Sequence, residues 1–95
     1  MSDARLKKIA YRASHRGFRE ADLILGGFAE RYLHALTPAQ LDAFEALLEE
    51  ADHDLYDWIV GREPAPPHVA AGEAFGLIRD FRHTLHAHRG EDRGA

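Results

Sequence analysis

Apolar residues recur three or four positions apart along almost the whole chain, as they do at Leu25, Phe28 and Tyr32, and no segment alternates apolar and polar residues as a strand does. This spacing predicts an all-α protein. A chain of 95 residues buries only about two-thirds of its unfolded surface on folding, so it has room for one small core. We therefore expect a compact single-domain bundle of about five helices over residues 1–88, followed by a flexible tail over residues 89–95.

The sharpest helix boundary lies at Thr37, which is predicted to cap a helix that starts at Pro38. Gln40 stands where a capping box places its glutamine, so its side chain should bind back to the backbone of Thr37. Periodicity and the remaining turn signals place the other helices. The expected helices are 3–15, 19–35, one from residue 38 onward, a short one after Asp52 or Asp54 that ends at Gly61, and 68–86.

Three glycines and two acids set the expected local geometry at and within these helices. Gly17 should end the first helix in the left-handed conformation and let another backbone come close. Gly26 and Gly27 lie inside the second helix, where they predict a bend or close packing against another helix. Asp52 or Asp54 should cap the short fourth helix.

Charge is distributed unevenly along the chain. The formal net charge is −4, but residues 5–19 carry six Lys and Arg, whereas residues 42–57 carry seven acids and no Lys or Arg. A basic first helix can touch nucleic acid, yet the acidic segment would repel phosphate, and solvated helix faces are the more ordinary explanation. We expect no nucleic-acid partner, and we keep a small helical nucleic-acid-binding or regulatory module as the alternative function.

Cysteine is absent, which excludes disulfides, thiolate zinc sites and a cysteine nucleophile, and which fits a reducing compartment. No apolar run approaches the roughly 18 residues that a membrane-spanning helix needs. The N-terminal residues lack the apolar core of a secretion signal. These features predict a cytoplasmic protein without direct membrane insertion.

Side chains that could carry catalysis or bind a metal are poorly placed. Ser14 lies beside His15, but neighbouring helical residues point about 100° apart, and no nucleophile-elbow motif surrounds them. His83, His86 and His88 would not converge on one metal ion from a helix, and no zinc-protease signature occurs. The sequence also lacks a phosphate loop and a dinucleotide fingerprint. We therefore expect no catalytic residue, no metal site and no cofactor-binding residue in this chain.

The segment from Arg16 to Asp22 places a glycine and several charges between two predicted helices. Arg16 offers a forked donor, and Glu20 offers a carboxylate acceptor. Gly17 leaves the backbone between them uncovered. This combination suits docking to another protein better than catalysis, although helix termination plus solvated charges would also account for it.

Two motifs resemble those of the SdhE-type succinate dehydrogenase assembly factors, also called FAD assembly factors. The first is Arg16-Gly17-x-x-Glu20-x-Asp22, which is similar to the family's Arg-Gly-x-x-Glu motif. The second is similar to the family's Leu-Leu-Glu, acidic and Asp-Leu-aromatic-x-Trp segment, and it consists of Leu47, Leu48, Glu49, Asp52, Asp54, Leu55, Tyr56 and Trp58. Either motif alone is weak evidence, but both at this separation are more specific, and the resemblance covers about residues 5–82.

The resemblance implies a five-helix bundle that binds the flavoprotein subunit of succinate dehydrogenase, and in some bacteria that of fumarate reductase. It also implies that the bundle promotes covalent attachment of FAD to a histidine of that subunit, as an assembly factor rather than an enzyme, without binding FAD tightly itself. Carried over to this chain, the docking residues are Arg16, Gly17 and Glu20, with Arg19 and Asp22 as neighbours. The free chain is expected to be a monomer.

Overall fold

The computed structural model describes the backbone of residues 3–94 and the side chains of residues 3–84. The described backbone is helical and contains no strand, which confirms the all-α prediction. The expected flexibility of residues 89–95 lies outside the residues whose side chains are described. The helices are α1 (Asp3–Ser14), α2 (Arg19–Tyr32), the 3-10 helix η1 (Leu33–Ala35), α3 (Pro38–Leu47), α4 (Asp52–Val60), α5 (Pro67–Ala70) and α6 (Phe75–Gly94).

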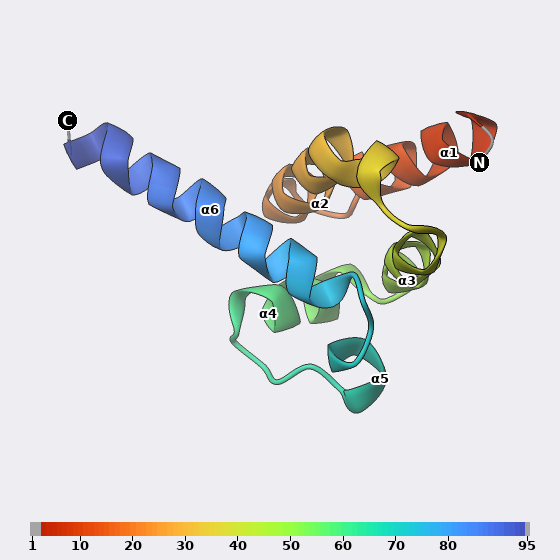
Figure 1. Ribbon diagram of the computed structural model, residues 1–95. Helices are drawn as coiled ribbons and strands as arrows, with labels where there is room; N and C mark the ends of the chain where they lie inside the picture. Colours follow the sequence, from red (N-terminus) through yellow and green to blue (C-terminus); the bar gives the residue numbers. More distant parts are fainter. Residues whose placement is uncertain (1–2, 95) are drawn as a thin grey trace.

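The helices pack around α6. Helices α1 and α2 lie side by side on one side of α6, and α4 and α5 lie on the other side (Figure 1). Helix α3 sits at the end of the bundle near the start of α6, and the C-terminal end of α6 projects past the other helices. Both α2 and α4 contact α6. The start of α2 lies beside the start of α4, because the ring of Phe18, which precedes α2, stacks on that of His53 in α4.

One apolar core lies between these helices. Phe28 is its centre, with its ring centroid 5.3 Å from that of Phe44 and 6.0 Å from that of Phe81. Tyr32, which the periodicity places with Phe28, lies at the edge of the core with 41% of its surface exposed. The other large buried side chains are Ile9, Leu25, Leu41, Leu55 and Ile78.

The predicted boundary at Thr37 is confirmed in detail. The side-chain oxygen of Thr37 accepts a hydrogen bond from the backbone N–H of Gln40 at 3.1 Å, and the side-chain oxygen of Gln40 accepts one from the N–H of Thr37 at 2.9 Å. Pro38 takes the first helical position. Helix α4 ends at Gly61, also as predicted, and this glycine has φ of 82°, in the left-handed region.

The paired glycines inside α2 mark close packing, as expected. A Cβ atom at Gly26 would lie 3.0 Å from the Cβ of Ser14 on α1. A Cβ atom at Gly27 would lie 3.3 Å from the ring of Phe81 on α6. Glycine therefore lets α2 approach α1 on one side and α6 on the other.

The prediction of one continuous helix over 68–86 is wrong. The chain forms the short helix α5, turns at Gly72, and starts α6 at Phe75. Val69 and Phe75 are both buried. In a continuous helix these residues would point about 120° apart, which is wider than the roughly 100° apolar face of a typical surface helix, so the break helps both to reach the core.

Candidate partner-binding site

The turn between α1 and α2 is fastened to a distant part of the chain. The backbone N–H of Gly17 donates a 2.6 Å hydrogen bond to Oδ2 of Asp52, which lies 35 residues further on. The other oxygen of the same carboxylate lies 2.7 Å from Nη2 of Arg16. The start of α4 is thereby joined to the segment that carries the predicted docking residues.

The guanidinium of Arg16 is used inside the fold. Nη1 donates to the backbone oxygen of Leu48 at 2.8 Å, and Nη2 donates to that of Glu50 at 3.0 Å. Only 8% of the Arg16 side chain is exposed. These carbonyls follow the end of α3, where they lack helical partners, so Arg16 satisfies them and sets the position of the turn.

The reason for glycine at position 17 differs from the one predicted. Gly61 is the only glycine with positive φ in the described residues, so the expected left-handed conformation of Gly17 is wrong. A Cβ atom on Gly17 would instead lie 2.6 Å from Oδ2 of Asp52. The absence of a side chain allows this carboxylate to reach the backbone N–H of Gly17.

The predicted capping role of Asp52 or Asp54 is also wrong. Ala51 takes the N-cap position of α4, and no side chain there accepts a capping hydrogen bond. Asp52 is the first helical residue, and its carboxylate points across to Arg16 and Gly17. The negative charge of Asp52 still stabilises α4, because it lies at the positive end of the helix dipole.

The five predicted docking residues fall into two groups. Gly17, Arg19 and Glu20 are exposed, and the side chains of Arg19 and Glu20 make no hydrogen bond or ion pair within residues 3–84. Asp22 is half-buried, and its carboxylate accepts a hydrogen bond from the backbone N–H of Arg16. Arg16 and Asp22 therefore hold the shape of the turn, whereas the other three are open to another molecule.

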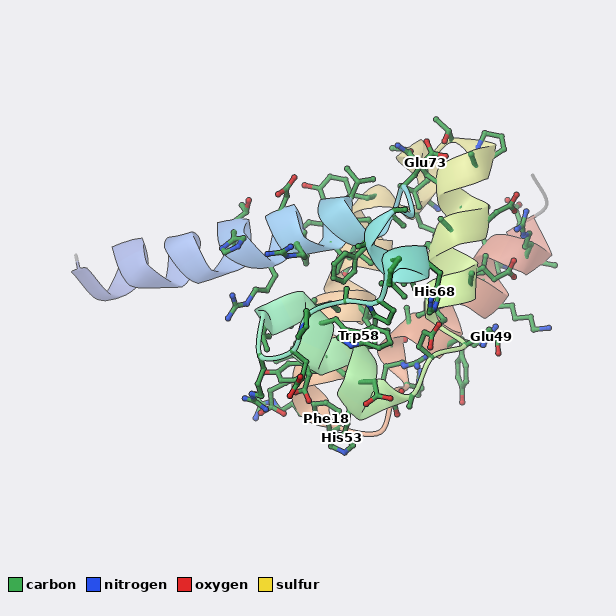
Figure 2. The ribbon with its side chains drawn as sticks, turned by 90° about the horizontal axis from the view of Figure 1, so that it is seen from below. Phe18, Glu49, His53, Trp58, His68 and Glu73 are labelled. Atoms are coloured by element: carbon green, nitrogen blue, oxygen red, sulfur yellow. The ribbon has the colours of Figure 1, made fainter. Side chains whose placement is uncertain are left out.

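An aromatic cluster beside Gly17 was not predicted from the sequence. The ring of Phe18 stacks on that of His53, with centroids 4.6 Å apart and planes 9° apart, and it meets Tyr56 edge-on at 5.2 Å. Figure 2 shows Phe18 and His53 together at one end of the molecule. No local signal in the sequence pairs Phe18 with His53, because the two residues lie far apart along the chain.

The two arginines of the basic first helix, α1, are paired with acids within the molecule. Arg5 lies 2.7 Å from Asp42 and 2.9 Å from Glu45, and Arg12 lies 2.6 Å from Glu49. Two hydrogen bonds raise the pKa of Arg5: the larger effect comes from Asp42, and the next largest comes from Glu45. The acids of α3 and of the turn that follows it thus pair with arginines of α1, which leaves fewer cations of α1 available to bind phosphate.

Ser14 and His15 lie closer together than predicted. Because α1 ends at Ser14, His15 leaves helical geometry, and its Nδ1 lies 3.1 Å from Oγ of Ser14. The same Nδ1 lies 2.8 Å from the backbone oxygen of Tyr11, so it must carry a proton and donate it there. A protonated Nδ1 cannot take a proton from Ser14, so the pair does not form an activated nucleophile.

Metal binding and membrane insertion receive no support from the described part of the chain. Within it, no three His, Asp or Glu side chains are arranged to hold a metal ion. The side chains of His86 and His88 lie outside the described residues. None of the described helices combines the length and apolar character needed to span a bilayer.

Comparisons with known proteins agree with the two sequence motifs. A family model described as flavinator of succinate dehydrogenase matches residues 7–82. The FAD assembly factor SdhE of Acetobacter pasteurianus is 37% identical over 79 residues, which cover 83% of this chain and 72% of that protein. Succinate dehydrogenase assembly factor 2 of Candida glabrata is 34% identical over 83% of this chain and 54% of its own length. The corresponding protein of Mycosarcoma maydis is 39% identical over 99% of this chain and 40% of its own length, so the match spans about half or less of these mitochondrial relatives.

Proposed function

This chain belongs to the family of succinate dehydrogenase flavinators, and we propose that it binds the flavoprotein subunit of succinate dehydrogenase and promotes covalent attachment of FAD to that subunit. The observation that carries the proposal is the family match over residues 7–82, which contains both the Arg16–Asp22 segment and α4. The flavoprotein of fumarate reductase is a second proposed client. We place the activity in the cytoplasm, because a chain without cysteine forms no disulfides and therefore needs no oxidising compartment.

The proposed mechanism needs no catalytic group in this chain. A binding protein shifts a conformational equilibrium of its partner only by the difference between its affinities for the two states. Selective binding worth about 3 kcal/mol would change the ratio of those states more than a hundredfold. The bundle would hold the flavoprotein in the arrangement in which FAD and the acceptor histidine react, and then dissociate.

The proposed docking surface is the turn between α1 and α2. Gly17 presents exposed backbone without a side chain, and Arg19 and Glu20 present charges of opposite sign that have no partner within residues 3–84. Arg16 and Asp22 contribute by fixing the turn against the end of α3 and the start of α2. A preformed turn loses little conformational freedom on binding, which favours affinity.

Co-expression with the flavoprotein subunit from the same genome tests the proposal. Covalent flavin is measured as fluorescence of the subunit after denaturation, with and without this chain, and complex formation is measured with the purified proteins. We expect a stable complex and a several-fold rise in covalent flavin. No complex and no rise would refute the proposal, and strongly salt-dependent binding to duplex DNA would then favour the alternative module.

The isolated protein is expected not to bind FAD tightly. The larger cavities identified among the described residues have volumes of only about 300 to 380 Å³, at the small end of the range for ligand pockets. No glycine-rich phosphate loop is present in the sequence to hold a pyrophosphate. Isothermal calorimetry of the purified chain with FAD checks this prediction, and a submicromolar dissociation constant would contradict it.

Neutralising Lys7 and Lys8 is expected to slow association with the flavoprotein. Both side chains are exposed on α1 and lie outside the proposed docking turn. Peripheral charges steer the encounter more than they hold the complex, so the association rate should fall a few-fold at low salt while the dissociation rate stays the same. Stopped-flow measurements at low salt and at about 0.5 M salt provide the control, because salt should abolish the difference. A change confined to dissociation would count against steering.

A further inference from the structure

Phe18 occupies a position where its side chain cannot stabilise the start of α2 by a hydrogen bond. It is the N-cap residue of that helix, and it offers no side-chain oxygen to the free N–H groups of the first turn. Serine, threonine, aspartate or asparagine is preferred at such positions because its oxygen accepts one of these hydrogen bonds. The ring of Phe18 instead turns toward α4 and stacks on His53.

His53 is held close to the proposed docking turn. It follows Asp52, whose carboxylate binds both the N–H of Gly17 and the guanidinium of Arg16. His53 is exposed, and Phe18 and Tyr56 are half-buried behind and beside it. The stacked rings therefore lie next to the exposed backbone of Gly17. Asp52, which precedes His53, binds the N–H of Gly17 and so joins the two parts.

The composition of this face is that of an interface centre. Aromatic side chains are enriched at the centres of protein interfaces, where they carry much of the binding energy, and charged side chains gather at the rim. Here the stacked rings are flanked in sequence by the exposed charges of Arg19, Glu20 and Asp54. Rings that are already stacked lose little freedom when a partner covers them.

The geometry points to the His53–Phe18 ring stack as a second part of the surface that docks the flavoprotein subunit, with the outer face of the His53 ring covered by an apolar or planar group of that subunit. This inference rests on the proposed function. It follows from the continuity of the stack with the Gly17 turn, and it makes His53 a residue that determines partner affinity through its ring rather than its charge.

Replacing His53 tests this inference. We expect His53→Ala to weaken binding to the purified flavoprotein subunit about tenfold, and His53→Phe, which keeps a stackable ring without a charge, to restore binding to within about threefold of the unmodified protein. His34→Ala is the matched control, because His34 is an exposed histidine of η1 at the far end of α2. It should bind like the unmodified protein.

Melting temperature separates docking from a purely structural role of the stack. Because His53 is exposed, both His53 variants should melt within about 3 °C of the unmodified protein. Unchanged binding by His53→Ala, while the unmodified chain binds and promotes flavinylation, would overturn the inference and leave the proposed function intact. Weaker binding that follows a loss of melting temperature, or that His53→Phe does not restore, would also overturn it. Failure of the unmodified chain to bind would refute the proposed function itself.

Discussion

Replacing Arg16 with alanine is expected to lower the free energy of unfolding by about 2 kcal/mol, a loss of roughly 10 °C in melting temperature for a domain of this size. The guanidinium, only 8% exposed, bonds the carbonyls of Leu48 and Glu50 and pairs with Asp52. Alanine would leave both carbonyls and the carboxylate without their cationic partner. Because 30% of the Asp52 side chain is exposed, water replaces part of the loss, so the cost stays below that of breaking a fully buried pair.

Arg12→Ala is the matched control for this prediction. Arg12 lies four residues earlier, in α1, and pairs with Glu49, but 68% of the Glu49 side chain is exposed. Exposed pairs of this kind stabilise proteins by about 0.5 kcal/mol, so Arg12→Ala should shift the melting temperature by only a few degrees. Thermal melts followed by circular dichroism measure both. Equal melting of the two variants would show that the Arg16 network adds no more stability than a surface pair.

The position of Arg16 changes how its variants should be interpreted. A loss of flavoprotein binding in Arg16→Ala would follow from displacement of the turn even if the guanidinium never touches the partner. Glu20→Ala is more informative, because Glu20 is exposed and makes no hydrogen bond or ion pair within residues 3–84. Its replacement should weaken binding through the loss of a charge-assisted contact while the melting temperature stays the same.

Features of the fold that depend on neighbouring residues could be predicted from the sequence. The capping box of Thr37 and Gln40 joins residues three positions apart, and its geometry is the same in any helix that starts this way. Gly61 ends α4 for an equally local reason, because glycine adopts positive φ at little cost. Helical periodicity likewise placed Leu25 and Phe28 on one apolar face, and both are buried in the core.

Features that depend on distant contacts could not be predicted in the same way. An aspartate at the start of a helix is equally suited to capping that helix or to binding a group elsewhere, and only the folded chain brings Asp52 to Gly17 across 35 residues. The stack of Phe18 on His53 has the same origin. The sequence therefore predicted the candidate site as a segment, and its role in docking stays a prediction. The division between residues that shape the segment and residues that are exposed required the structure.

Gly17→Asn is expected to weaken binding to the flavoprotein subunit by at least about thirtyfold, the size of an interface hot spot. The new side chain would project from the turn that we propose the partner covers. The fold should survive, because φ of Gly17 is not in the left-handed region and the atom that the new Cβ would meet is the end of the Asp52 side chain. We expect a cooperative melt a few degrees below that of the unmodified protein, since the hydrogen bond from the Gly17 N–H to Asp52 is lost.

A double-mutant cycle with Asp52→Ala separates the two possible reasons for glycine at this position. If Gly17 is required only because Asp52 needs the space, then Asn at position 17 should cost no further binding once Asp52 is alanine, because the carboxylate that it would displace is gone. If the partner packs against the bare backbone, the same Asn should weaken binding by the same factor in either background. We expect the second result. Binding by the double variant equal to that of Asp52→Ala alone would assign Gly17 to the internal contact and leave Arg19, Glu20 and the ring stack as the exposed parts of the docking surface.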